Sequence, residues 1–115
     1  MRLESMKHLD DMRRAAGLIS QFVAGRDLDD YVADPQLRSA VERQFQILGE
    51  ALTRLTKTDA AAAGRISHAT RIIAFRNILT HGYDIVDNEV VWDVIETDLP
   101  VLRQQVAAAL ADEPQ

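Results

Sequence analysis

Residues 76–83 carry side chains whose types suit acid–base and phosphate chemistry. The segment reads Arg-Asn-Ile-Leu-Thr-His-Gly-Tyr and follows the apolar run 72–75. Arg76, Asn77, His81 and Tyr83 therefore stand close together in the chain, at the end of a stretch apolar enough for a buried helix. A guanidinium, an amide, an imidazole and a phenol grouped in this way indicate a candidate site.

These side chains suit the cleavage of an RNA phosphodiester. An imidazole titrates near neutral pH and can accept or give a proton. A guanidinium holds a phosphate through two hydrogen bonds and keeps its charge. Because RNA supplies its own nucleophile, the 2′-hydroxyl group, His81 and Arg76 could suffice without a metal ion. Asn77 could hold the phosphate or orient the imidazole, and Tyr83 could stack on a base or bind phosphate.

The spacing of the motif leaves its geometry open. Arg76 and His81 are five residues apart, or ~140° around a helix axis, whereas Asn77 and His81 share one face. Unwinding near Gly82, a long arginine that wraps back, or a symmetric dimer would each bring Arg76 and His81 together. Ordinary structural roles are open as well, because cations at a helix C-terminus interact favourably with its dipole.

Other chemistries have little support in the sequence. The chain has no cysteine, and its histidines, His8, His68 and His81, lack the paired spacing of a metal site. We expect His8 and His68 to be solvated. The chain also has no glycine-rich phosphate loop. We therefore expect neither a metal ion nor a cofactor.

Composition predicts a soluble cytoplasmic protein that forms a single domain over residues 1–115. With 47% hydrophobic residues, the sequence is too apolar for intrinsic disorder. It shows neither the apolar core of a signal peptide nor the run of ~20 apolar residues that a helix needs to span a bilayer. The absence of cysteine fits a reducing compartment. The formal net charge of −5 disfavours a broad electrostatic hold on nucleic acid. Contacts with RNA would be local, around Arg65, Arg71 and Arg76, or would need two chains.

Hydrophobic periodicity predicts an all-α protein, an up-and-down bundle of four long helices with one extra short helix. The first helix is predicted over residues 3–24, the short one over 28–32 and the second long helix from Asp34 and Pro35, a cap and a first-turn proline, to about 57. Within that helix Gly49 costs ~1 kcal/mol relative to alanine. Its presence indicates the close approach of another backbone, and the adjacent Glu50 is expected to pair with an arginine.

The sequence also predicts where the third and fourth helices begin and end. The third should start at a Ser67 cap and end at residues 81–82, with Arg76 facing packed surface and a wide apolar stripe left for a second copy of the chain. The fourth should be capped by Asp87 or Asn88. Pro100 should kink it, or restart it behind an Asp98 cap, and the tail from 112 should fray.

The chain resembles the HepT-like toxins of the HEPN superfamily. Arg76, His81 and Tyr83 match that family's Arg-x4-His-x-Tyr motif, and the flanking segments 49–51, 91–92 and 98–100 match its pattern in order. The resemblance covers about residues 5–110. It departs at Ser67 and His68, where members often carry Pro-Trp.

The resemblance implies a HEPN-like bundle that forms a homodimer, with both motifs facing one cleft. It implies a metal-independent endoribonuclease toxin acting on tRNA or mRNA, with Arg76 and His81 catalytic and Asn77 and Glu50 supporting. Tyr83 would be the residue that a partner antitoxin, an MntA-like nucleotidyltransferase, modifies with AMP, and the added charge and bulk would block RNA. Two alternatives stay open: a non-catalytic module that binds a nucleotide or a nucleotidyltransferase, and a purely structural dimerisation bundle.

Overall fold

The structure, a computed structural model, describes residues 2–82 and 86–112, and these residues are almost entirely helical. It contains α1 (Leu3–Val23), α2 (Leu28–Ala33), α3 (Pro35–Thr58), α4 (Ala60–Ala63), α5 (Ala69–His81), α6 (Asn88–Asp93), a π-helical stretch η2 (Val94–Asp98) and α7 (Leu99–Ala111). No strand occurs in the part of the chain that is described. The prediction of an all-α fold is confirmed.

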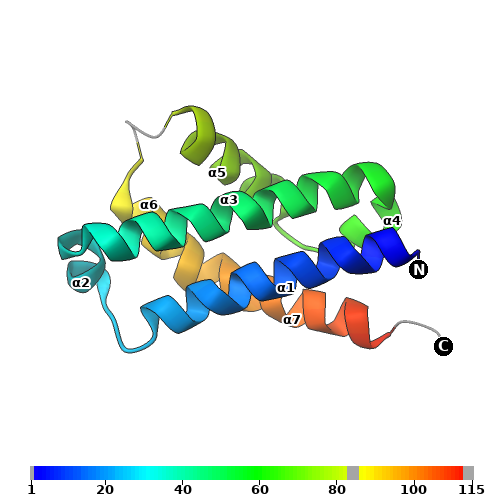
Figure 1. The fold of residues 1–115 in the computed structure, drawn as a ribbon, viewed down its shortest axis with the longest axis horizontal. Coiled ribbons are helices and arrows are strands. Elements are labelled where there is room, and N and C mark those ends of the chain that lie inside the picture. Colours follow the sequence, from blue (N-terminus) through cyan, green and yellow to red (C-terminus); the bar gives the residue numbers. More distant parts are fainter. Residues whose placement is uncertain (1, 83–85, 113–115) are drawn as a thin grey trace.

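The long helices form an elongated bundle. Figure 1 shows α1 and α3 running antiparallel, with α7 beside α1. Helix α5 packs against α3, and the short α2 contacts α3 and α6. The four predicted long helices correspond to α1, α3, α5 and the arm formed by α6, η2 and α7. The predicted short helix is α2, and α4 adds one further turn.

The predicted apolar stripes meet in one core. Leu9, Met12, Ala16 and Ile19 of α1 are fully buried, as are most stripe residues of α3. Burying a leucine, isoleucine or methionine side chain contributes ~1.5–3 kcal/mol. The rings of Phe45 and Phe75 lie edge to face with centroids 5.1 Å apart, and this contact joins α5 to α3. The core therefore fixes the position of the helix that carries the motif.

Two of the predicted helix caps are confirmed. The carboxylate of Asp34 accepts a hydrogen bond from the backbone N–H of Leu37 at 3.1 Å, and Pro35 opens α3. Asp87 caps α6 by accepting from the N–H of Glu89 at 2.8 Å. Both caps are local interactions, which a sequence pattern can predict.

The other two predicted caps, Ser67 and Asp98, are wrong. Helix α5 begins after His68, which has a left-handed φ of 64°, and the N–H of Ser67 donates to the side chain of Gln105. The fourth arm is interrupted before Pro100, as predicted, but by the π-helical stretch. The buried Asp98 does not cap α7. Its carboxylate contacts His68 Nδ1 at 2.6 Å and accepts from Arg71 at 3.3 Å. These partners lie about thirty positions away in sequence.

Candidate functional site

A pocket of about 310 Å³ lies where α1, α3 and α5 meet. Its lining combines three arginines, two carboxylates, one histidine and a few neutral side chains: His8, Asp11, Arg43, Gln46, Ile47, Glu50, Ala51, Arg54, Arg76 and Thr80. Guanidinium groups gathered at a concave surface form a suitable binding site for an anion.

Gly49 allows α5 to lie close to α3 beside this pocket. A Cβ atom added at Gly49 would lie 2.5 Å from Cγ of Arg76 and closer still to its Cβ. Real Cβ atoms do not approach other atoms this closely. The sequence predicted close approach of a backbone at Gly49, but the nearest atoms are the side-chain carbons of Arg76. The absence of a side chain at position 49 therefore makes room for the aliphatic part of Arg76, the candidate phosphate-binding residue.

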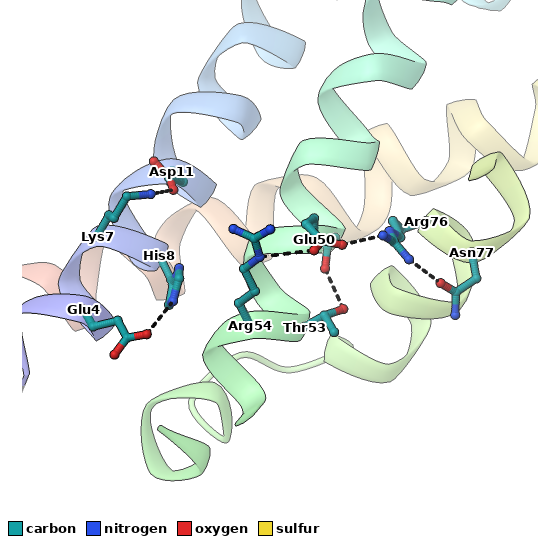
Figure 2. Close-up of polar contacts among 10 residues, drawn as sticks. Glu4, Lys7, His8, Asp11, Glu50, Thr53, Arg54, Arg76 and Asn77 are labelled. Carbon is teal, nitrogen blue, oxygen red and sulfur yellow. Dashed lines mark hydrogen bonds and ion pairs between the residues drawn. The ribbon is translucent and has the colours of Figure 1, made fainter. Parts of the chain in front are cut away.

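The guanidinium of Arg76 is held on two sides (Figure 2). Its Nη2 donates to Oε2 of Glu50, and its Nη1 donates to Oδ1 of Asn77 at 2.9 Å. The other carboxylate oxygen of Glu50 accepts from Nε of Arg54 at 3.1 Å. Glu50 thus bridges two arginines from two helices, which confirms the expected pairing of Glu50 with an arginine.

These bonds leave Arg76 with unused donors. A guanidinium has five N–H groups, and the bonds to Glu50 and Asn77 use two of them. Its Nε is buried and has no hydrogen-bond partner among the described residues. The side chain is 24% exposed and lines the pocket, as its predicted orientation towards packed surface requires. A bound phosphate could take up the remaining N–H groups that reach the pocket.

His81 lies apart from this pocket. It is the last residue of α5, it is exposed, and the N–H of Gly82 donates to the carbonyl of Ile78 at 2.8 Å. The helix therefore stays wound up to the motif histidine, and unwinding does not bring His81 to Arg76. Asn77, which contacts Arg76, is four residues before His81 and shares its helix face. Tyr83 lies outside the described residues.

Several residues line the pocket that the sequence did not indicate as site residues. His8, Arg43, Arg54 and Thr80 all line the pocket. The expectation of a solvated His8 is wrong, because this residue is only 6% exposed. A signal was present: His8 lies three residues after Ser5 and four before Met12, the spacing of a buried helix face.

The other arginines expected to contact RNA are engaged elsewhere. Arg65 pairs with Asp112 at 2.7 Å, and Arg71 pairs with Asp93 at 2.7 Å and with the buried Asp98. The hydrogen bond from Arg71 lowers the pKa of Asp93 below its usual value. Neither of these arginines lines the pocket. Of the three arginines that the sequence marked as possible RNA contacts, only Arg76 does.

Across residues 2–82 and 86–112, no three His, Cys, Asp or Glu side chains are grouped so that they could hold a metal ion. In the same ranges, no helix combines the length and the apolar character needed to cross a membrane.

The geometry defines a helical protein whose arginine-rich pocket includes Arg76, the first residue of the Arg-x4-His-x-Tyr sequence motif. A model of the ribonuclease HepT-like family matches residues 12–109. The chain therefore belongs to the HepT-like ribonuclease family.

Relatives agree with this assignment. The chain is 28% identical over 106 residues to "Putative RNase TTE0752" of Caldanaerobacter subterraneus subsp. tengcongensis, covering 92% of this chain and 94% of the relative. It is 27% identical over 103 residues to "Probable ribonuclease HepT" of Thermococcus cleftensis, covering 90% and 93%. It is 26% identical over 98 residues to "Putative RNase MJ1380" of Methanocaldococcus jannaschii, covering 85% and 89%. No significant match to a solved structure was found.

Proposed function

We propose that this chain is a metal-independent endoribonuclease toxin whose Arg76 and His81 act on an RNA phosphodiester. One observation carries the proposal: Arg76 is positioned at a pocket by Glu50 and Asn77 and still has N–H donors to offer. Membership of a ribonuclease family supports the same substrate class. Asn77 and Glu50 would be positioning residues, because both contact the guanidinium.

The proposed reaction is an internal transfer at phosphorus. The 2′-oxygen of one nucleotide forms a bond to phosphorus while the bond to the 5′-oxygen of the next breaks. His81 takes the proton of the 2′-hydroxyl or gives a proton to the leaving oxygen. Arg76 stabilises the charge that develops on the phosphate oxygens. The products are a 2′,3′-cyclic phosphate and a 5′-hydroxyl end.

We propose that the complete site forms between two copies of the chain. His81 does not line the pocket of its own chain, and the apolar Ile78 of the same helix is 42% exposed. A symmetric dimer through this part of α5 would cover Ile78 and bring His81 to the partner's pocket.

A mixing experiment tests the shared site. Arg76→Ala and His81→Ala are each expected to be inactive. Co-refolding them in equal amounts should restore roughly a quarter of wild-type activity, because half of the dimers would be mixed and each would hold one intact site. No recovery, in a mixture that light scattering shows to be dimeric, would contradict the shared arrangement.

The central experiment is RNA cleavage in the presence of EDTA. Purified wild-type protein should cleave tRNA or mRNA into fragments with cyclic phosphate ends, and His81→Ala should not. Cleavage that persists in His81→Ala would remove the assignment. Stable binding to a nucleotidyltransferase without any cleavage would favour the non-catalytic alternative.

Regulation through Tyr83 belongs to the same proposal and rests on the family motif. An MntA-like nucleotidyltransferase antitoxin would transfer AMP from ATP to the phenol oxygen, with release of pyrophosphate, and would add negative charge two residues after His81. Mass spectrometry after co-expression with such an enzyme should show an AMP-sized increment on the peptide containing Tyr83. The increment should be absent from Tyr83→Phe, and its absence from wild-type protein would refute modification.

A further inference from the structure

The pocket holds a second cationic position that the proposed chemistry does not use. Arg43 lines the pocket from α3 and forms no ion pair with a carboxylate of the described residues. The other two arginines of the pocket, Arg54 and Arg76, share the carboxylate of Glu50. Arg43 therefore brings an unneutralised charge to the pocket.

The polar groups of α3 form a row along one helix face. Arg43, Glu50 and Arg54 follow one another at seven and four residues, the spacing of a single face. Arg43 lies two turns, or ~10 Å along the axis, from Glu50, which holds Arg76. The pocket is therefore long enough to present cations at two separated points.

His8 supplies a further hydrogen-bonding group from the opposite wall. The residue is almost fully buried, yet it lines the pocket. Figure 2 shows its ring on α1, across from Arg54 of α3. The carboxylate of Glu4 lies 3.9 Å from its Nε2, too far for a hydrogen bond. No hydrogen bond within the described residues engages its ring nitrogens. An imidazole always carries at least one N–H donor.

We propose that this pocket is a phosphate-binding subsite for the RNA strand, in which Arg43 binds the phosphate of a nucleotide adjoining the cleaved bond and His8 donates a hydrogen bond to the same strand. The inference rests on the proposed function, because Arg76 is taken to hold the cleaved phosphate. The two carboxylates of the pocket do not oppose it. Glu50 is shared by two arginines, and Asp11 accepts from Lys7 at 2.8 Å. Three arginines against two carboxylates leave the pocket with a net positive charge in a chain of net charge −5.

Binding measurements test the subsite independently of cleavage. In a His81→Ala background, the affinity for a fluorescently labelled single-stranded oligoribonucleotide is measured by anisotropy at several salt concentrations. Adding Arg43→Gln should raise Kd roughly 10-fold, as expected for one charge-assisted hydrogen bond. It should also reduce the slope of log K against log salt by ~0.7, the loss of one phosphate contact.

Arg103→Gln is the matched control. Arg103 is an exposed arginine of α7 that lies outside the pocket, and its Nη1 donates to Ser20. The substitution removes the same charge, so it should leave Kd nearly unchanged. A second variant, His8→Phe, keeps an aromatic ring but removes its N–H and should raise Kd about threefold. If His8→Phe fails to fold by circular dichroism, the exposed Arg43 still decides the question.

The outcomes separate the subsite from the proposed reaction. If wild-type protein cleaves RNA but Arg43→Gln binds like Arg103→Gln, the subsite is wrong and the nuclease assignment stands. If wild-type protein does not cleave but binding depends on Arg43, the subsite stands and the catalytic assignment fails. Absence of any measurable RNA binding overturns the subsite.

Discussion

Gly49→Ala tests how the packing of α3 against α5 positions Arg76, the candidate phosphate-binding residue. An added Cβ at position 49 would meet Cγ of Arg76 at 2.5 Å, well inside normal contact distance. The stem of Arg76 begins at the helix backbone and cannot swing away without moving α5. The substitution should therefore shift Arg76 relative to Glu50 and the pocket.

Two opposing terms set the size of the effect on stability. Alanine is favoured over glycine by ~1 kcal/mol in a helix interior. Overpacking a tight contact costs ~1–3 kcal/mol. The free energy of unfolding should therefore fall by ~0–2 kcal/mol. Gly17 provides the matched control, because it lies inside α1 and an added Cβ there meets nothing within 4 Å.

Urea denaturation followed by circular dichroism at 222 nm measures both variants. The free energy of unfolding of Gly17→Ala should exceed that of wild type by ~1 kcal/mol, which corresponds to a few degrees in Tm. The free energy of unfolding of Gly49→Ala should be ~1–3 kcal/mol lower than that of Gly17→Ala. RNA cleavage should decrease in Gly49→Ala and stay unchanged in Gly17→Ala. If Gly49→Ala is as stable and as active as Gly17→Ala, the close contact between Gly49 and Arg76 does not position the site.

Three further perturbations follow from the ion pairs and caps. Asp98→Asn should cost ~2 kcal/mol in urea denaturation, because a buried carboxylate loses its charge-assisted bonds, while the exposed control Asp93→Asn should change little. The backbone N–H of Leu37, at the start of α3, donates to the carboxylate of Asp34 and lowers the pKa of Asp34 below 3.8. The stabilisation that this cap provides is therefore present above pH 3.8 and is lost as the pH falls through the lowered pKa. Asp34→Ala should be less stable than wild type at pH 7, and the difference should shrink below about pH 4; a constant difference across acid denaturation would contradict the cap. Glu50→Gln should reduce kcat of RNA cleavage about 10-fold, because Arg76 loses its charged anchor, and unchanged kinetics would remove Glu50 from the site.

The helices could be predicted because their signals are local. Apolar residues at steps of three and four placed Leu9, Met12 and Ile19 on one buried face, and the Asp34–Pro35 pair placed the start of α3. Such patterns depend only on helix geometry and on hydrogen bonds within one turn. The same holds for Asp87 at the start of α6.

The wrong caps show where local reasoning failed. Ser67 and Asp98 have the residue types of helix caps, but their partners come from distant parts of the chain: Gln105 for Ser67, and His68 and Arg71 for Asp98. A side chain that can bond its own helix end can also bond a group brought near by packing. Only the relative placement of α5 and α7 selects between these two outcomes.

The sequence by itself determined the helical fold, the family motif and the chemistry that Arg76 and His81 could perform, because these depend on residue type and spacing along one chain. The tertiary structure alone decided that Arg76 lies against Gly49, that Glu50 joins it to Arg54, and that His8 and Arg43 share its pocket. These residues come from three helices. Their convergence follows from how the buried faces of those helices pack, which no spacing within a single helix encodes.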